Sequence, residues 1–152
     1  MAEYSTALDR IDREILGILR DDGRIGWSEL GTRVHLSANA TAERVRRLVR
    51  AGVIRRFTVE VDQGALGRTL EAVIDVRVAP GNRFSDVLAE CDEVLWLAHV
   101  TGRTDIQVHV ACAGTPGLQR LLTRFRDEFG AAETTTTVVL ETFRPHRPDV
   151  AR

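Results

Sequence analysis

The stretch LSANATAERVRRLVRAGVIRRF, Leu36 to Phe57, decides the fold of the first part of the chain. It places six arginines and one glutamate between Glu43 and Arg56, although the 152-residue chain has a formal net charge of only -1. The charge is unevenly distributed, with 11 Arg against 8 acidic residues up to Phe57 and 10 Arg against 14 acidic residues after it. Such a cluster of positive charge attracts polyanions through release of their counterions.

Apolar periodicity predicts two helices before this stretch. In residues 6–19, Leu and Ile recur at intervals of three and four positions, and Thr6 with Asp9 matches a capping box at the start. The following segment DDGRIG is typical of a turn. Ser28 is then expected to cap a short helix that buries Leu30 and Val34.

A third helix is expected to begin after Ser37, a favourable N-cap, and to end near Gly52, which suits a C-terminal cap. At about 100 degrees per residue, one side of this helix faces the core. The residues on that side are Ala38, Thr41, Ala42, Val45, Leu48 and Val49. A short helix, a tight turn and a second helix with a polar face are the parts of a helix-turn-helix.

The other side of the third helix predicts a contact surface for double-stranded DNA. Arg can bind guanine and Asn can bind adenine through paired hydrogen bonds, while small side chains allow close approach. The next segment, VIRRFTVEVD, is expected to form a short strand, the wing, which would contact phosphate. The candidate DNA-binding residues are Ser37, Asn39, Ala40, Glu43, Arg44, Arg46, Arg47 and Arg50 in the helix, with Arg55 and Arg56 in the wing. The alternative is a charged, solvated helix face without a ligand.

The rest of the chain predicts a second domain and makes the whole an α+β protein. LEAVIDVRV, VLWLAHVT, DIQVHVACA and TTTTVVLETF have strand character, and FSDVLAEC and GLQRLLTRFRDEF have helical character. The order βαββαβ is ferredoxin-like, an antiparallel sheet with two helices on one face. We therefore expect a winged helix-turn-helix at residues 1–57, a linker strand and hinge at 58–69, and the ferredoxin-like domain at 70–152.

Alternation along the strands indicates what each face of this sheet contacts. The side expected to hold the helices carries Ile106, Val108, Val110 and Cys112. The reverse side is semi-polar and carries Glu71, Val73, Asp75, Arg77, Gln107, His109 and Ala111. This mixture suits pairing with a second copy of the chain, so we predict a homodimer. A twofold dimer can present two recognition helices to a palindromic DNA site.

Other features argue against several functions. No apolar run reaches the roughly 18 to 20 residues of a membrane span and no signal segment is evident, so we expect a cytoplasmic protein without a membrane partner. Cys91 and Cys112 lack metal-site spacing and are expected to be buried free thiols. No phosphate loop, zinc-protease motif or nucleophile elbow occurs, so we expect no cofactor, no metal and no catalytic residues.

Several segments resemble those of one family over nearly the whole chain. LDRIDREILGILRDDGR, ELGTRVHLS, ERVRRLVRAGVI and VDQGALG are similar to segments of the Lrp/AsnC family, the feast/famine regulators of bacteria and archaea. The resemblance implies a ligand-responsive transcriptional regulator. It also implies that the second domain is an effector-binding RAM domain that forms dimers, often assembles them into octamers, and commonly responds to amino acids.

The resemblance further implies an effector site between RAM domains of neighbouring dimers, bordered by the turn between the second and third RAM strands and by the last strand. Here Gly102 would allow close backbone approach, and Asp105 would pair with the ammonium group of an amino acid. The threonine hydroxyls would bind its carboxylate. The candidate effector-binding residues are Val100, Thr101, Gly102, Arg103, Thr104, Asp105, Thr134, Thr135, Thr136 and Thr137.

Four positions depart from the family pattern. Many members have glycine where His35 and Arg56 stand, an apolar residue at Thr41 and an aromatic residue at Thr104. Thr41 is expected to donate a hydrogen bond to an upstream carbonyl and so to stay on the core side.

Two other functions remain open. Siroheme decarboxylases resemble the same two-part fold, and such an enzyme would use His99 and His109 with Arg77 or Arg103 around the carboxylates of a porphyrin. A nucleoid-type protein would instead bind DNA by charge with little sequence preference. The regulator is favoured because packing explains both histidines and because the arginine-rich helix presents groups that can read bases.

Overall fold

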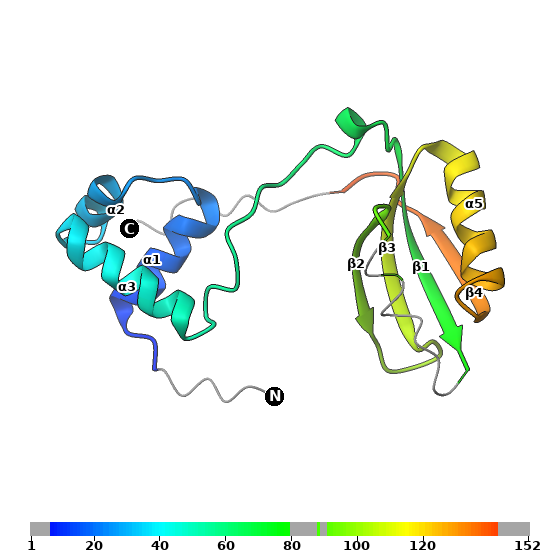
Figure 1. Ribbon diagram of the computed structural model, residues 1–152, viewed down its shortest axis with the longest axis horizontal. Coiled ribbons are helices and arrows are strands. Elements are labelled where there is room, and N and C mark those ends of the chain that lie inside the picture. Colours follow the sequence, from blue (N-terminus) through cyan, green and yellow to red (C-terminus); the bar gives the residue numbers. More distant parts are fainter. Residues whose placement is uncertain (1–6, 80–87, 89–90, 143–152) are drawn as a thin grey trace. The chain divides into compact units, whose positions relative to one another are not determined.

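The computed structural model describes residues 7–79, 88 and 91–142 (Figure 1). The chain divides into two compact units between Glu60 and Val61, a point inside the predicted linker. Among the described residues, no helix combines the length and apolar character needed to cross a bilayer. We call the part up to Glu60 the N-terminal unit and the part from Val61 the C-terminal unit.

Within its described residues, the N-terminal unit contains three helices, as predicted. They are α1 (Arg10–Asp21), α2 (Trp27–Arg33) and α3 (Ala38–Arg50). Their apolar sides meet in a core that contains Ile15, Ile25, Leu30, Val34, Val45 and Leu48. The prediction that Val49 is buried is wrong, because the neighbouring helices cover only a narrow arc of α3 and leave Val49 44% exposed.

Two predicted helix starts need correction. The capping box of α1 joins Asp9 and Asp12, not Thr6 and Asp9: the Asp12 amide donates to Asp9 Oδ1 at 2.7 Å, and the Asp9 amide donates to Asp12 Oδ2 at 3.3 Å. Thr6 lies outside the described residues. Helix α2 begins one residue before Ser28, with Gly26 as its N-cap, so Ser28 lies within the first turn.

The turn between α2 and α3 is tight because its backbone segments touch. A Cβ atom on Gly31 would lie 2.6 Å from the Leu36 carbonyl oxygen, so only glycine fits there. His35, where many family members have glycine, adopts the left-handed conformation with φ 56°. Thr41 donates its hydroxyl hydrogen to the Ser37 carbonyl at 2.9 Å and is buried, which confirms the expectation for this position.

The end of α3 follows the predicted glycine signal, but the wing does not form. Gly52 has φ 70°, its amide donates to the Val49 carbonyl, and the Val53 amide donates to the Leu48 carbonyl, which together make a Schellman cap. In the described residues from Val53 to Asp62 there is no strand, so the predicted wing strand is wrong. An extended segment becomes a strand only where another strand accepts its hydrogen bonds, and here none does.

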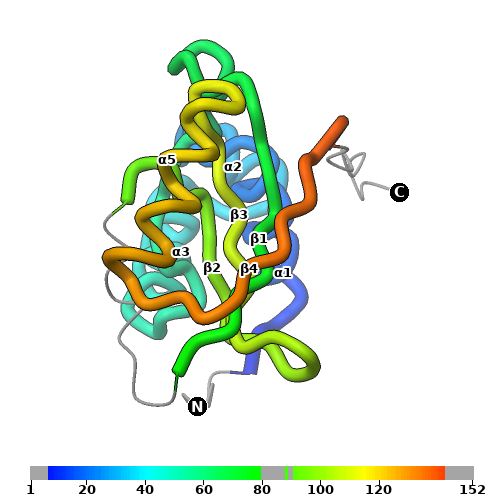
Figure 2. Tube along the Cα trace, turned by 90° about the vertical axis from the view of Figure 1, so that its right-hand side faces the viewer, coloured from blue at the N-terminus to red at the C-terminus, as the bar shows by residue number. Residues whose placement is uncertain are grey.

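The C-terminal unit is built on a four-stranded antiparallel sheet, which Figure 2 shows with α5 packed across it. Its elements are the 3₁₀ turn η1 (Gly64–Leu66), the strands β1 (Leu70–Val78), β2 (Val94–His99), β3 (Ile106–Cys112) and β4 (Ala131–Val138), and the helix α5 (Gly114–Asp127). The strand order β2-β3-β1-β4 is that of the ferredoxin-like fold. The predicted helix at residues 84–91 lies outside the described residues, apart from buried Leu88 and half-buried Cys91.

The two faces of the sheet differ as the alternation predicts. The helix-covered face carries a core that includes Ile74, Val76, Ile106, Val108, Val110, Leu121 and Phe125. Most residues expected on the reverse face are only partly buried, but Ala111 is fully buried. Glu71 lies directly opposite Ala111 in the register, and its larger side chain is enough to cover the methyl group of Ala111.

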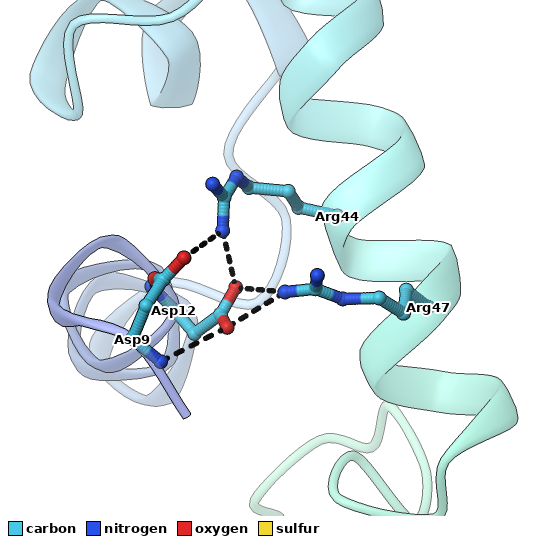
Figure 3. Close-up of polar contacts among 4 residues, drawn as sticks. All are labelled: Asp9, Asp12, Arg44 and Arg47. Atoms are coloured by element: carbon cyan, nitrogen blue, oxygen red, sulfur yellow. Dashed lines mark hydrogen bonds and ion pairs between the residues drawn. The ribbon is translucent and has the colours of Figure 1, made fainter. Parts of the chain in front are cut away.

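One buried carboxylate joins α1 to α3 (Figure 3). The side chain of Asp12 is only 1% exposed, and Arg47 Nη2 donates to its Oδ1 and Oδ2 at 2.8 and 2.7 Å. Arg44 Nη1 donates to Asp12 Oδ1 at 2.9 Å and to Asp9 Oδ2 at 2.6 Å. A carboxylate removed from water needs such donors, so these bonds hold the N-terminus of α1 against α3.

Replacing this carboxylate should destabilise the N-terminal unit. We expect Asp12→Ala to lower the free energy of unfolding by about 2 to 4 kcal/mol, because it breaks a largely buried ion pair and half of a capping box. Urea unfolding in a Trp96→Phe background, where Trp27 fluorescence reports on this unit, measures the change. Glu14→Ala on the same helix removes only an exposed pair with Arg10 and should cost about 0.5 kcal/mol or less. Equal losses in the two variants would contradict this role for Asp12.

The same contacts make the folding stability of the N-terminal unit depend on pH. The pKa of Asp9 lies below its usual range because the Asp12 amide donates to its carboxylate and because Arg44 donates a second bond. A lowered pKa contributes stability above the unfolded value of about 3.9, and this stability is lost as pH falls through the folded pKa. We therefore expect Asp9→Asn, which keeps an N-cap, to reduce the loss of stability between about pH 5 and pH 3. Urea unfolding at stepped pH tests this, and an unchanged pH profile would contradict it.

Candidate nucleic-acid interface and effector site

Helix α3 presents an exposed, charged face. The side chains of Arg46 and Arg50 are each 64% exposed, and that of Glu43 is 60% exposed. Arg50 Nη2 donates to Glu43 Oε1 at 2.7 Å and Arg46 Nη1 donates to Oε2 at 3.4 Å, and these bonds, the one from Arg50 first, hold the pKa of Glu43 below its usual range. Ion pairs this exposed contribute little free energy, so a DNA phosphate or base edge can replace them.

The N-terminus of α3 adds polar groups to the same face. Ser37 Oγ accepts a hydrogen bond from the Ala40 amide at 3.2 Å, so this hydroxyl already caps the helix. Asn39 and Ala40 are exposed in the first turn. The positive end of the helix dipole favours phosphate there, and the small Ala40 side chain permits close approach.

Arg44 and Arg47 lie differently from the other arginines of α3. Sequence reasoning put both on the DNA-facing side, but their guanidinium groups are bound to Asp9 and Asp12 of α1 (Figure 3). Arg44 is only 26% exposed and Arg47 is 46% exposed. The sequence analysis did not identify Asp9 and Asp12 as partners of these arginines. The available signal was a pair of acidic residues at the start of α1 in a chain whose third helix carries four arginines. Arg55 and Arg56 lie in the exposed segment after α3, not on a wing strand.

In the C-terminal unit, the β2–β3 turn is tied to the end of β1. The Val100 amide donates to the Asp105 carbonyl, and the Asp105 amide donates to the Val76 carbonyl, both at 3.0 Å. Asp105 Oδ2 accepts a hydrogen bond from the Val78 amide at 2.9 Å. Gly102 has φ 126°, which favours glycine at this position. One carboxylate oxygen of Asp105 is therefore used to position the turn.

A pocket of about 310 Å³ lies beside this turn. It is lined by Asp75, Arg77, Arg103, Thr104, Glu133 and Thr135. Arg77 Nη2 donates to the Arg103 carbonyl at 2.9 Å, and Arg77 Nη1 lies 3.7 Å from Glu133 Oε2. The pocket thus contains three of the predicted effector residues, Arg103, Thr104 and Thr135. It also contains Asp75 and Arg77, which the sequence analysis assigned to the dimer face. Glu133 was not among the predicted site residues. The antiparallel register of β1 and β4 aligns the charges, and no sequence periodicity reveals that register.

The four predicted threonines of β4 divide between the two faces of the sheet. Thr135 and Thr137 pair with Asp75 and Val73 in the register and so share the reverse face with them. Thr134 and Thr136 are half-buried on the helix-covered side. Among the predicted residues, Val100, Thr101, Gly102 and Asp105 belong to the turn but do not line the pocket.

Of the two histidines invoked for an enzyme, His109 is packed into the reverse face, whereas His99 at the end of β2 is exposed, so packing does not explain both as expected. His109 Nε2 lies 3.0 Å from Glu71 Oε2, and the His109 ring makes an edge contact with Trp96 at 5.9 Å between centroids. In the described part of the chain, no group of three or more His, Cys, Asp or Glu side chains is arranged to hold a metal ion. Cys112 is buried, as expected, whereas Cys91 is only half-buried, and burial raises the pKa of each thiol.

Comparison with known proteins bears on both units. The model of the AsnC-type helix-turn-helix domain matches residues 8–49, and the model of the Lrp/AsnC ligand binding domain matches residues 71–149. The HTH-type transcriptional regulator Rv2324 of Mycobacterium tuberculosis is 34% identical over 145 residues, which cover 93% of this chain and 97% of that protein.

Solved structures are similar over nearly the full length. The feast or famine regulatory protein Rv3291c of Mycobacterium tuberculosis, complexed with L-methionine, has a TM-score of 0.87 at 32% identity, covering 95% of this chain and 99% of that one. The regulator NMB0573 of Neisseria meningitidis, also complexed with L-methionine, has a TM-score of 0.82 at 24% identity, covering 91% and 94%, and supports the fold. With both domain models and these relatives in agreement, the chain belongs to the Lrp/AsnC family of transcriptional regulators.

Proposed function

We propose that this regulator binds double-stranded DNA through the exposed face of α3 and alters that binding when an amino acid occupies the pocket beside the β2–β3 turn. The exposed group of Glu43, Arg46 and Arg50 carries the proposal, since its ion pairs are weak enough to be exchanged for DNA contacts. Asn39 and Ala40 would face the bases with it, while Ser37 keeps its capping role. Arg55 and Arg56 would contact phosphate.

In this proposal the four arginines of α3 have two roles. Arg46 and Arg50 can turn toward guanine, and Glu43 can accept a hydrogen bond from cytosine. Arg44 and Arg47 are held by α1, so they would contribute positive charge near the backbone and fix the angle of α3. The exposed groups of α3 include Glu as well as Arg. This mixture favours a protein that reads bases over a nucleoid-type protein that binds DNA by charge alone.

Residues that read bases and residues that contact phosphate should differ in how their substitution changes the sequence preference of DNA binding. We expect Arg46→Ala to weaken binding to a selected operator by roughly 1 to 3 kcal/mol and to flatten the preference among sequences, whereas Arg56→Ala weakens binding to all duplexes alike. Fluorescence anisotropy with the operator and with a scrambled duplex at fixed salt measures both. Arg10→Ala on α1 removes the same charge and serves as the control. Equal losses on the two duplexes for Arg46→Ala would contradict base reading.

The chemistry of the turn pocket supports an amino-acid effector. Arg77 and Arg103 can bind a carboxylate, while Asp75 and Glu133 can accept hydrogen bonds from an ammonium group. The hydroxyls of Thr104 and Thr135 add neutral partners. Two structural relatives in complex with L-methionine support the ligand class. The free oxygen of Asp105 would act at the rim.

The role of Asp105 can be separated from its effect on the turn. We expect Asp105→Asn, which keeps an oxygen for the Val78 amide but loses the charge, to weaken effector binding about tenfold while basal DNA binding stays unchanged. Calorimetric titration with L-methionine, followed by the other amino acids, measures the affinity. A Thr137→Ala variant, also on the reverse face but outside the pocket, provides the control. Unchanged affinity in Asp105→Asn would remove this residue from the site.

Assembly and location follow from the same proposal. The reverse face of the sheet, with Trp96 44% exposed beside the Glu71–His109 pair, would join two copies in a homodimer, and further contacts could join dimers into an octamer. A DNA-binding regulator works in the cytoplasm, where the chromosome is. The chain would act by binding alone, since its reported relatives are named as regulators and the packing of His109 leaves the porphyrin hypothesis without support.

A further inference from the structure

A second pocket of about 350 Å³ lies in the C-terminal unit, at the end of the sheet opposite the effector turn. Figure 1 shows the start of α5 at one end of the sheet and the β2–β3 turn at the other. The register agrees, because Leu70 pairs with Cys112 at the pocket end of β1 and β3, while Val76 pairs with Ile106 at the turn end. The pocket is therefore separate from the proposed effector site.

The floor of this pocket is made of small and apolar groups. Cys112, Ala113, Gly117 and Leu121 line it, together with the exposed Leu66 of η1. A Cβ atom on Gly117 would lie 3.3 Å from Cys112 Cβ and 3.6 Å from Ala113 Cβ, so the first turn of α5 lies close against the end of β3. A volume of this size is at the small end of the range of roughly 300 to 1,000 Å³ for ligand pockets.

The rim carries charges of both signs that do not neutralise one another. Arg68, Arg120 and Arg124 lie on it with Asp92 and Glu93. Within the described residues, the side chains of Asp92, Glu93 and Arg120 form no hydrogen bond or ion pair. Burial raises the pKa of the Cys112 thiol, and Glu93 raises it further, while Arg68 and Arg120 partly oppose the rise.

The start of α5 adds a further feature that favours an anion. Its N-cap, Ala113, has no side chain able to accept a hydrogen bond from the first amides of the helix, so no side chain caps this end. The helix spans 14 residues, and its dipole is positive where it enters the pocket. A carboxylate bound there would lie near the positive end of this dipole and pair with arginine at the same time.

We propose that this pocket is a second binding site, for a small dipolar metabolite with one carboxylate and one ammonium group, of which an α-amino acid is the simplest kind. Arg68, Arg120 and the start of α5 bind the carboxylate, and Asp92 and Glu93 bind the ammonium group. The side chain of the ligand lies over Leu66 and Leu121. Because η1 and Arg68 connect directly to β1, an occupant also fixes the segment that leads into the sheet.

Calorimetric titration of the full-length Asp105→Asn variant with the twenty standard α-amino acids tests this site apart from the turn pocket. We expect at least one of them to bind, and its dissociation constant to rise about tenfold or more when Arg120→Ala or Glu93→Gln is added. Adding Arg126→Ala, on the same helix but outside the pocket, should leave the constant unchanged. Acetate and propylamine, which each carry half of the ligand's charge, should bind at least about tenfold more weakly.

The outcomes separate this site from the proposed effector function. The proposal is wrong if no amino acid binds the Asp105→Asn variant, or if Arg120→Ala has no effect on the one that does. Acetate binding as tightly as the amino acid would overturn the dipolar class. Since the side chains of Arg120 and Glu93 form no hydrogen bond or ion pair among the described residues, both variants should keep the circular dichroism spectrum of the parent chain. The effector proposal fails separately if an amino acid whose binding Arg120→Ala leaves unchanged binds the wild-type chain and the Asp105→Asn variant equally well.

Discussion

The arrangement of the N-terminal unit depends on one buried carboxylate. Asp12 closes the capping box of α1 and accepts hydrogen bonds from two arginines of α3, so a single side chain both starts one helix and orients another. The low dielectric of its surroundings strengthens these bonds and makes an unpaired carboxylate costly. The angle between α1 and α3 is therefore set by a polar contact as well as by the apolar core of Ile15, Leu30 and Leu48.

This constraint divides the positive charge of α3. Arg44 and Arg47 lie beside acidic partners and are immobilised, whereas Arg46 and Arg50 share one exposed glutamate and remain able to move. In the proposed complex with DNA, the immobilised cations would provide a fixed field near the phosphates, and the mobile ones could adapt to base edges at little cost. A helix face that appears uniform in the sequence thus contains two arginines that hold α1 and two that the proposed function assigns to DNA.

Local sequence signals predicted the positions of helices and strands better than they predicted which distant residues contact one another. The Gly52 cap, the Thr41 hydrogen bond, the positions of the strands along the chain and the helix-facing side of β3 were all predicted, because each depends on residues close in sequence or on simple alternation. The Thr6 cap and the wing strand failed because several polar residues could start α1, and because a strand needs a partner that periodicity does not supply. The aspartates that bind Arg44 and Arg47 lie more than thirty positions away, beyond any local pattern.

The same limit applies to the C-terminal unit, where the charged pockets arise from register. At the turn end of the sheet, β1 and β4 align Asp75 and Arg77 with Thr135 and Glu133, and the β2–β3 turn adds Arg103. At the other end, the start of α5 meets the segment that leads into β1. The ferredoxin-like sheet thus carries mixed charges at both ends of its central strands, with an apolar core between them. Because β1 runs between the two pockets, a ligand at either proposed site would contact groups at one end of the first strand of the C-terminal unit.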